Sequence, residues 1–174
     1  MFGNMYKEFI NQGLVWLTLV GGVFLVLFLI GKTFKVKLKF FQKNALLFAF
    51  IVSLIATLGS LFFSEIMLYE PCRLCWYQRI FMYPQVILFG VLLYRREKSG
   101  LIFSLIMSVI GALIAGFHYV QQIFPSSVLS CDVLGYSVSC VQTFFLEFGY
   151  ITIPMMALTA FLMLIVFAYL EYIK

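Results

Sequence analysis

Five long apolar stretches run through this chain of 174 residues and limit what it can fold into. They cover approximately residues 14–31, 44–63, 77–94, 101–123 and 150–170. A helix of about 20 apolar residues spans the roughly 30 Å hydrocarbon core of a bilayer. With 64% hydrophobic and only 11% charged residues, the chain has more apolar surface than a soluble domain of this size buries. Because helices satisfy their own backbone hydrogen bonds in lipid, we predict an all-α, polytopic membrane protein.

Basic residues are concentrated in two of the connections between these stretches. They are Lys32, Lys35, Lys37, Lys39 and Lys43 after the first stretch, and Arg95, Arg96 and Lys98 after the third. By the positive-inside rule, both connections are expected on the cytoplasmic side of the membrane. The connections 64–76 and 124–149 then face outward, with the amino terminus outside and Lys174 inside. All four cysteines would lie in a compartment that permits disulfides.

The amino-terminal part of the chain allows two other interpretations, which we disfavour. The basic connection could bind nucleic acid, but lysines alternating with apolar residues between two spans are better explained by topology and anionic lipid headgroups. Residues 1–30 could be a cleaved signal peptide, but the first charges, Lys7 and Glu8, balance and no small-x-small cleavage site follows. We therefore predict no nucleic-acid partner and a retained first helix. Residues 1–43 would add this helix and its basic connection to a four-helix membrane domain, 44–174, with two cysteine-bearing loops.

The four cysteines fall into a close pair, Cys72 and Cys75, and a wider pair, Cys131 and Cys140. Two dithiols at a membrane surface suggest thiol–disulfide exchange. The third apolar stretch begins just after Cys75, and Arg79 follows one helical turn later. The helix dipole and the guanidinium should therefore lower the pKa of Cys75 and make its thiolate reactive. Arg79 is a candidate functional residue, and its structural alternative is an interfacial anchor.

Structural roles for the cysteines remain open alternatives. Four thiolates could bind zinc tetrahedrally, although such sites usually hold together small domains without a core of their own. Cys131 and Cys140 alone could form a passive loop disulfide, worth about 2.7 kcal/mol for a loop of about ten residues. That role leaves Cys72 and Cys75 unexplained, so we favour exchange and predict no metal.

Two blocks of residues surround the cysteine pairs. The first block is Pro71-Cys72, Leu74-Cys75, Tyr77 and Arg79, and the second is His118, Gln122, Pro125-Ser126 and Cys131-Asp132. The first block is similar to the pattern P-C-x-L-C-x-Y-x-R of the DsbB family. Together with the order of the pairs and the topology, the two blocks resemble this family of quinone-dependent membrane disulfide oxidoreductases, which includes the BdbC-type proteins. The likeness runs from about Asn44 to the carboxyl end. In the vitamin K epoxide reductase family, by contrast, the loop pair precedes the CxxC pair.

The resemblance implies a four-helix transmembrane bundle, here with one additional amino-terminal helix, and a role for each cysteine. Cys131–Cys140 would be the loop disulfide that accepts electrons from a reduced DsbA-like thioredoxin-fold partner, with Cys131 forming the mixed disulfide. The electrons would pass to Cys72 and Cys75, and Cys75 would face a membrane quinone, ubiquinone or menaquinone.

Two further residues would act on the quinone. Arg79 would hold or polarise its ring. His118, the single histidine, could hydrogen-bond a quinone carbonyl or relay a proton, or it could be an interfacial aromatic. The predicted function is oxidation of an extracytoplasmic thiol oxidant in the bacterial cytoplasmic membrane. The alternative is a non-enzymatic membrane scaffold with two structural disulfides.

Overall fold

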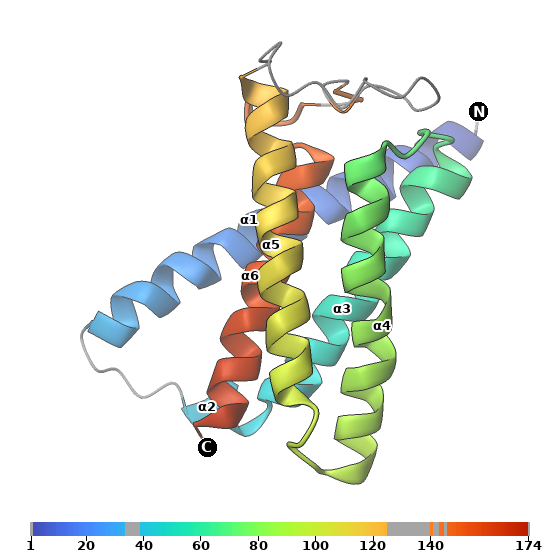
Figure 1. Ribbon diagram of the computed structural model, residues 1–174. Helices are drawn as coiled ribbons and strands as arrows, with labels where there is room; N and C mark the ends of the chain where they lie inside the picture. Colours follow the sequence, from blue (N-terminus) through green and yellow to red (C-terminus); the bar gives the residue numbers. More distant parts are fainter. Residues whose placement is uncertain (1, 34–38, 125–139, 141–142, 145, 174) are drawn as a thin grey trace.

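The computed structural model describes residues 2–33, 39–124, 140, 143–144 and 146–173, and these are mostly helical (Figure 1). The helices are α1 (Phe2–Thr33), α2 (Lys39–Lys43), α3 (Ala45–Leu61), α4 (Arg73–Arg95), α5 (Leu101–Ile123) and α6 (Ile153–Tyr172). A π-helical turn, η1 (Phe62–Ile66), continues α3. Over these ranges the β pairing is limited to an isolated bridge between Glu147 and Ile151. The prediction of an all-α protein is confirmed.

Helices α3, α4, α5 and α6 pack side by side as a four-helix bundle, and α1 crosses it obliquely against α6 (Figure 1). Gly111 of α5 lets this helix pack tightly on α6, because a Cβ atom there would overlap the ring of Phe161. Phe89 of α4 and Leu164 of α6 are fully buried in the same core. The predicted bundle with one additional amino-terminal helix is therefore confirmed.

Four helical segments are long and apolar enough to cross a membrane: Met5–Gly31, Ala45–Ile66, Leu101–Ile123 and Ile153–Tyr172. Helix α4, with 23 residues, has the length of a span but carries more polar side chains. Gln85 in its middle is fully buried, and its Oε1 accepts hydrogen bonds from Ser104 and Ser108 of α5, both at 2.9 Å. The polar groups of α4 thus face its neighbours, as expected for a helix enclosed in a membrane bundle.

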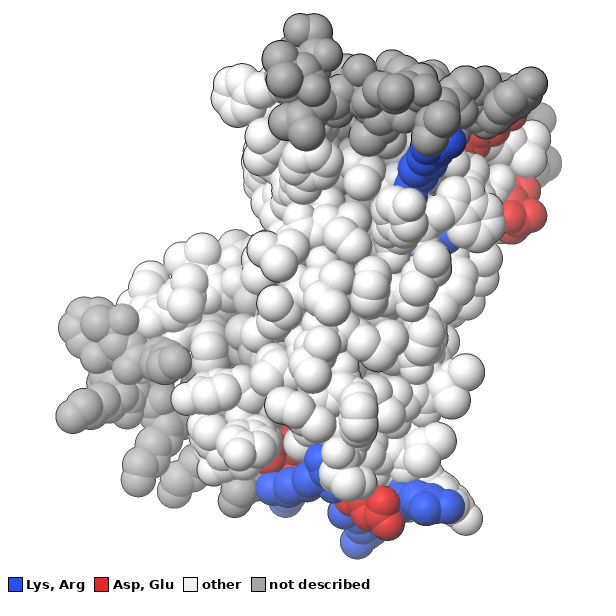
Figure 2. Space-filling view, viewed as in Figure 1, with Lys and Arg blue, Asp and Glu red and all other residues white. Residues whose placement is uncertain are grey.

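Charged side chains gather at the two ends of the bundle and leave an uncharged middle on the face shown in Figure 2. At one end, α4 stops at Arg96, whose φ of 54° is left-handed. Lys98 in the following turn donates a hydrogen bond to the Glu171 carbonyl of α6 at 3.0 Å. The end of α3, the start of α4 and the end of α5 meet at the opposite end (Figure 1). This second end carries the cysteines that the structure describes.

Candidate redox site

Cys72 and Cys75 are positioned by the start of α4. Cys72 is the residue before the helix, with extended backbone angles of φ −69° and ψ 172°, and Cys75 lies in the first turn. The Cys72 thiol donates a hydrogen bond to the Cys75 sulfur, and the two Sγ atoms are 3.2 Å apart. The structure therefore holds this pair in direct contact as a dithiol.

The contact between the two sulfurs separates their acidities. Both residues precede the apolar stretch 77–94 and lie outside the membrane-spanning part of α4. The hydrogen bond to Cys75 and burial raise the pKa of Cys72 to about 12. The same hydrogen bond lowers the pKa of Cys75, against the effect of burial, and Arg79 contributes less. Cys75 is thus favoured as the thiolate. The sequence predicted the direction for Cys75, but it pointed to the helix dipole and Arg79 and missed Cys72 as the main cause.

His118, near the end of α5, joins the first dithiol to the Cys140 segment. Its side chain is only 2% exposed. Its Nε2 atom lies 3.1 Å from the Cys140 carbonyl oxygen and 3.6 Å from the Cys72 sulfur. Because a carbonyl oxygen only accepts, Nε2 carries a proton, and Nδ1 accepts from the Gln78 amide at 3.1 Å. This burial does not fit an interfacial aromatic, and it places a hydrogen-bond donor between two cysteine-bearing segments.

Three of the four cysteines come together at this point. Cys140 is 1% exposed and Cys72 is 4% exposed, and Cys140 lies close enough to Cys75 to raise the pKa of Cys75, which opposes the larger lowering by Cys72. Cys131, the predicted partner-reactive cysteine, lies outside the described residues. The structure therefore places one member of the loop pair beside the CxxC pair. Only eight residues separate Cys131 from Cys140, and from the sequence alone it could not be predicted how the two cysteine pairs approach each other.

Arg79 is held between α4 and α3 rather than extended toward water. Its Nε donates to the Ser60 hydroxyl at 3.1 Å, and one terminal nitrogen donates to the Ser60 carbonyl at 3.2 Å. Tyr83, one turn further along α4, donates to the same Ser60 hydroxyl at 3.2 Å. The guanidinium also lies 5.1 Å from the centre of the Trp76 ring. These contacts fix the charged group at the α3–α4 interface, close to the dithiol.

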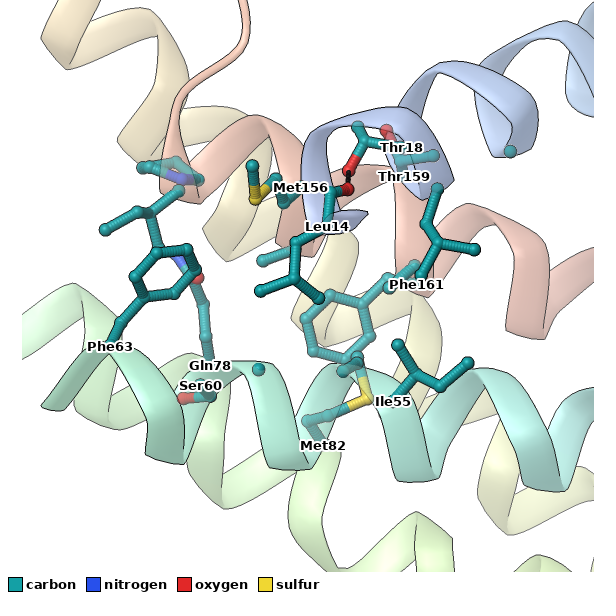
Figure 3. Close-up of a pocket in the computed structure, with 18 of the residues that line it drawn as sticks. Leu14, Thr18, Ile55, Ser60, Phe63, Gln78, Met82, Met156, Thr159 and Phe161 are labelled. Carbon is teal, nitrogen blue, oxygen red and sulfur yellow. Dashed lines mark hydrogen bonds between the residues drawn. The ribbon is translucent and has the colours of Figure 1, made fainter. Parts of the chain in front are cut away.

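A cavity of about 500 Å³ opens beside these residues. At one end it is lined by Cys72, Cys75, Arg79 and His118, and from there it continues between helices toward Phe167. Figure 3 shows Ser60, Gln78 and Met82 along one side and Met156 and Phe161 on the other. Apart from its polar end, the lining is almost entirely apolar. Cavities of this size and character bind small organic ligands.

The dithiol and the histidine also form a group that has the donor types of a metal site. The Cys72 and Cys75 sulfurs and a His118 nitrogen lie within 4.8 Å of one another. Two sulfurs and one imidazole nitrogen suit zinc, which takes a fourth ligand. This set differs from the four thiolates weighed from the sequence, since the third donor is His118. A metal ion here would occupy the same sulfurs that exchange requires.

Comparison with known proteins identifies the family. The sequence profile described as "Disulfide bond formation protein DsbB" matches residues 42–171. The chain belongs to the DsbB family. It is 44% identical over 131 residues to Disulfide bond formation protein C of Bacillus subtilis (strain 168), a match that covers 72% of this chain and 93% of that protein. No solved structure gives a significant match.

Other relatives with related names are similar to this chain over comparable lengths. Probable disulfide formation protein C 1 of Bacillus anthracis is 42% identical over 132 residues, covering 74% of this chain and 92% of that protein. The SPbeta prophage-derived disulfide bond formation protein B of Bacillus subtilis (strain 168) is 36% identical over 121 residues. This match covers 70% of this chain and 80% of that protein. The predicted resemblance is confirmed, and it supports a role as a membrane disulfide oxidoreductase.

The structure adds three residues to the site that sequence reasoning did not name. Gln78 contacts His118, and Ser60 and Tyr83 contact Arg79. The sequence contained a weak indication of Gln78 and Tyr83, since both are polar residues close to Arg79 in the apolar stretch 77–94. For Ser60 there was no such indication, because its partner is nineteen residues away in the chain.

Proposed function

We propose that this protein reoxidises an extracytoplasmic DsbA-like thioredoxin-fold protein and delivers the electrons to a membrane quinone, ubiquinone or menaquinone. One observation carries the proposal. The Cys72–Cys75 dithiol, Arg79 and His118 line the polar end of an apolar cavity, and Cys140 lies beside the same dithiol. This arrangement gives one pair of sulfurs access both to a second cysteine pair and to a lipid-soluble acceptor.

The cysteines would transfer the electrons by successive thiol–disulfide exchanges. A partner thiolate attacks Cys131 of the Cys131–Cys140 disulfide, and the second partner thiol then releases the oxidised partner and leaves Cys131 and Cys140 reduced. Cys140 next attacks Cys72 of the Cys72–Cys75 disulfide, which releases Cys75 as the thiolate. Cys131 resolves the Cys72–Cys140 bond, so that the loop disulfide is restored and Cys72 and Cys75 are the reduced pair. Each exchange breaks one S–S bond and forms another.

The polar groups of the site suit this sequence of steps. Cys72 has no thiol proton to donate while it is in a disulfide, so the positive charge of Arg79, which also lowers the pKa of Cys75, stabilises Cys75 as the leaving thiolate when Cys72 is attacked. His118 Nε2 can donate to the Cys72 sulfur when Cys72 in turn leaves as a thiolate. Gln78 holds the His118 ring in the tautomer that donates in this direction. The site therefore supplies a stabilising donor to each sulfur of the pair.

The polar end of the cavity also suits a quinone ring. Arg79 and His118 offer hydrogen-bond donors, which quinone carbonyl oxygens accept, and the rest of the lining is apolar. A quinone supplies a two-electron, two-proton acceptor, so that the Cys72–Cys75 dithiol returns to the disulfide. Arg79, fixed by Ser60, would orient the acceptor and stabilise developing negative charge on it.

The energetics favour an acceptor of this class. DsbA-type partners are strong oxidants, at about −120 mV, whereas glutathione pools lie well below this potential. For a two-electron couple, 30 mV corresponds to about 1.4 kcal/mol. A glutathione-like acceptor would therefore oppose the reaction, and a more oxidising one is needed.

Residue charges support an orientation with both cysteine-bearing loops outside the bacterial cytoplasmic membrane. The basic connection that follows α4 lies at the end of the bundle opposite the cysteines, as the positive-inside rule requires (Figures 1 and 2). We further propose that residues 44–174 form the catalytic membrane domain and that residues 1–43 are an addition to it.

The test is quinone reduction by purified protein in detergent. A reduced DsbA-like protein and a soluble quinone analogue are added, and quinone absorbance is followed beside the Cys75→Ser and Cys131→Ser variants. We expect reduction by the wild-type protein and none by either variant. Ser53→Ala is a control, because Ser53 donates within its own helix to the Phe50 carbonyl and does not line the cavity. If no quinone is reduced while both disulfides stay intact, the scaffold with two structural disulfides is the better description.

A further inference from the structure

Helix α1 lies outside the residues matched by the DsbB profile, yet it forms part of the cavity wall. Leu14, Thr18, Gly21 and Phe24 recur at intervals of three and four residues, so they share one face of α1. All four line the same cavity as Cys75 and Arg79. Figure 3 shows Leu14 and Thr18 on α1 directed toward the space between α3 and α6. The additional helix therefore contributes to the site.

Close contacts hold α1 in this position. A Cβ atom on Gly21 would lie 2.8 Å from the Met163 sulfur and 3.1 Å from Thr159 Cγ2, so a side chain here would have to displace Met163 or move α1 away from α6. On the other side, a Cβ atom on Gly59 of α3 would lie 3.3 Å from a Leu14 methyl group. Helix α1 thus bridges α3 and α6 and covers the gap between them.

An aromatic cluster closes the far end of the cavity. The ring of Phe24 lies 5.3 Å from that of Phe167 and 4.9 Å from that of Phe41, and Phe48 lies 5.6 Å from Phe167. These rings come from α1, α2, α3 and α6. On α3, Phe48 and Ser60 are twelve residues apart, or about 18 Å along the helix axis. The cavity is thus a long apolar channel that is polar at one end only.

We propose that α1 is the third wall of a channel, between α3 and α6, that encloses the isoprenoid tail of the quinone. This inference rests on the proposed function and specifies its ligand as a quinone with a prenyl tail. The channel is continuous with Cys75 and Arg79, so a ring held at the polar end directs its tail along α1. A phospholipid acyl chain has similar apolar chemistry, but a phospholipid has no group that accepts electrons from the Cys72–Cys75 dithiol at the polar end.

The consequence is a separation of ring binding from tail binding. Ring contacts come from α4 and α5, through Arg79 and His118, whereas α1 contributes only apolar contacts and Thr18, whose hydroxyl is bonded to its own helix at Leu14. A bulky side chain on the channel face of α1 should therefore reduce affinity for a tailed quinone. It should leave affinity for a tail-free quinone unchanged.

The test compares binding of menadione, which has no tail, with binding of a menaquinone that has the same ring and a short isoprenoid tail. Quenching of tryptophan fluorescence in detergent gives each Kd on protein whose Cys72 and Cys75 are oxidised to the disulfide, so that no thiol is available to reduce the quinone. The variants are Thr18→Phe, which fills the channel, and Gly21→Leu, which pushes α1 away from α6. The control is Ile30→Phe on the same helix, where the side chain is exposed and lies outside the channel.

We expect Thr18→Phe and Gly21→Leu to weaken binding of the tailed quinone about tenfold and to leave menadione binding within about twofold. Ile30→Phe should bind both as the wild type does. Unchanged affinity for the tailed quinone in both channel variants would overturn the inference. A tightly co-purified phospholipid that the tailed quinone does not displace would overturn it too. Failure of the wild type to bind or reduce either quinone would instead contradict the proposed function.

Discussion

The His118 ring bridges the Cys72 sulfur and the Cys140 backbone, with its Nε2 atom 3.6 Å from the one and 3.1 Å from the Cys140 carbonyl oxygen. This bridge brings together two segments that are 68 residues apart in the chain. It places Cys140, one member of the loop pair, next to the CxxC pair.

Cys72 and Cys140 should form a disulfide when their usual partners are removed. In the Cys75→Ser, Cys131→Ser double variant, mild oxidation should join these two buried residues in most molecules, because His118 already holds their segments together. Peptide mass spectrometry under non-reducing conditions identifies the linked peptides. Adding His118→Ala should slow the joining. A double variant in which both thiols stay free after oxidation would contradict the bridge.

Alkylation of the reduced protein should depend on pH in a way that distinguishes the two sulfurs. Because the pKa of Cys75 is lowered, its thiolate and its alkylation rate should persist below the pH range of an ordinary thiol. The rate should fall only as pH drops through that lowered pKa. With a pKa of about 12, Cys72 should stay protonated and react slowly at neutral pH. Mass spectrometry after short pulses of iodoacetamide measures both rates.

Two substitutions of Cys72 provide the control for this titration. Cys72→Ser keeps a hydrogen-bond donor beside Cys75, so the profile of Cys75 should move little. Cys72→Ala removes the donor, so the pKa of Cys75 should rise and its alkylation should shift to higher pH. Identical profiles for the two variants would mean that the Cys72 hydrogen bond is not the main cause of the shift.

Ser60→Ala should weaken quinone use without affecting exchange among the cysteines. The substitution removes the hydroxyl that accepts from Arg79 and Tyr83 while leaving the backbone carbonyl contact. If the lost hydrogen bond contributes about 1 kcal/mol to quinone binding by positioning Arg79, KM for quinone should rise roughly fivefold. Oxidation of a stoichiometric amount of reduced partner in the absence of quinone should be unchanged. Ser53→Ala, which removes a hydroxyl from the same helix away from Arg79, should alter neither measurement, and an equal effect of both substitutions would rule out a specific role for Ser60.

Gln85→Leu should destabilise the bundle without altering the site. Ser104 and Ser108 both donate to Gln85 Oε1, and they would lose this shared acceptor inside the membrane. Such interhelical bonds contribute about 0.6 kcal/mol each on average, so the free energy of unfolding should fall by about 1 kcal/mol. Thermal unfolding in detergent, followed by fluorescence, measures the change. Ser53→Ala should cost less, since Ser53 bonds within its own helix, and an equal loss would contradict the expected role of Gln85.

The helices were predictable from the sequence because hydropathy and length constrain them directly. Helix α5 occupies residues 101–123, as the sequence indicates. Helix α1 starts at Phe2 rather than near residue 14, because the residues before the apolar stretch contain no proline and the helix extends through them. Helix α3 continues through the π turn to Ile66, past the expected end near 63. These boundaries depend on local hydrogen bonding, which hydropathy does not report.

The site was predictable only in part. Cys72, Cys75 and Arg79 lie in one short segment, so their spacing alone indicated a reactive dithiol next to a positive charge. The contacts of His118 with Gln78 and Cys140 depend on how α5 packs against α4, and no local pattern records that packing. The same holds for Ser60 and for the channel face of α1. Interactions between distant helices therefore supply most of what the structure adds.

The polar side chains of α4 bear on how the protein enters the membrane. Gln85 in the middle of α4 and the charged Arg79 nearer its start are both costly for a helix that inserts alone. The partners that offset this cost, Ser60 on α3 and Ser104 and Ser108 on α5, flank α4 in the chain. Biogenesis should therefore retain α4 beside its two neighbours until all three are released into lipid together. The helix that carries the redox cysteines is the one that depends most on this assembly.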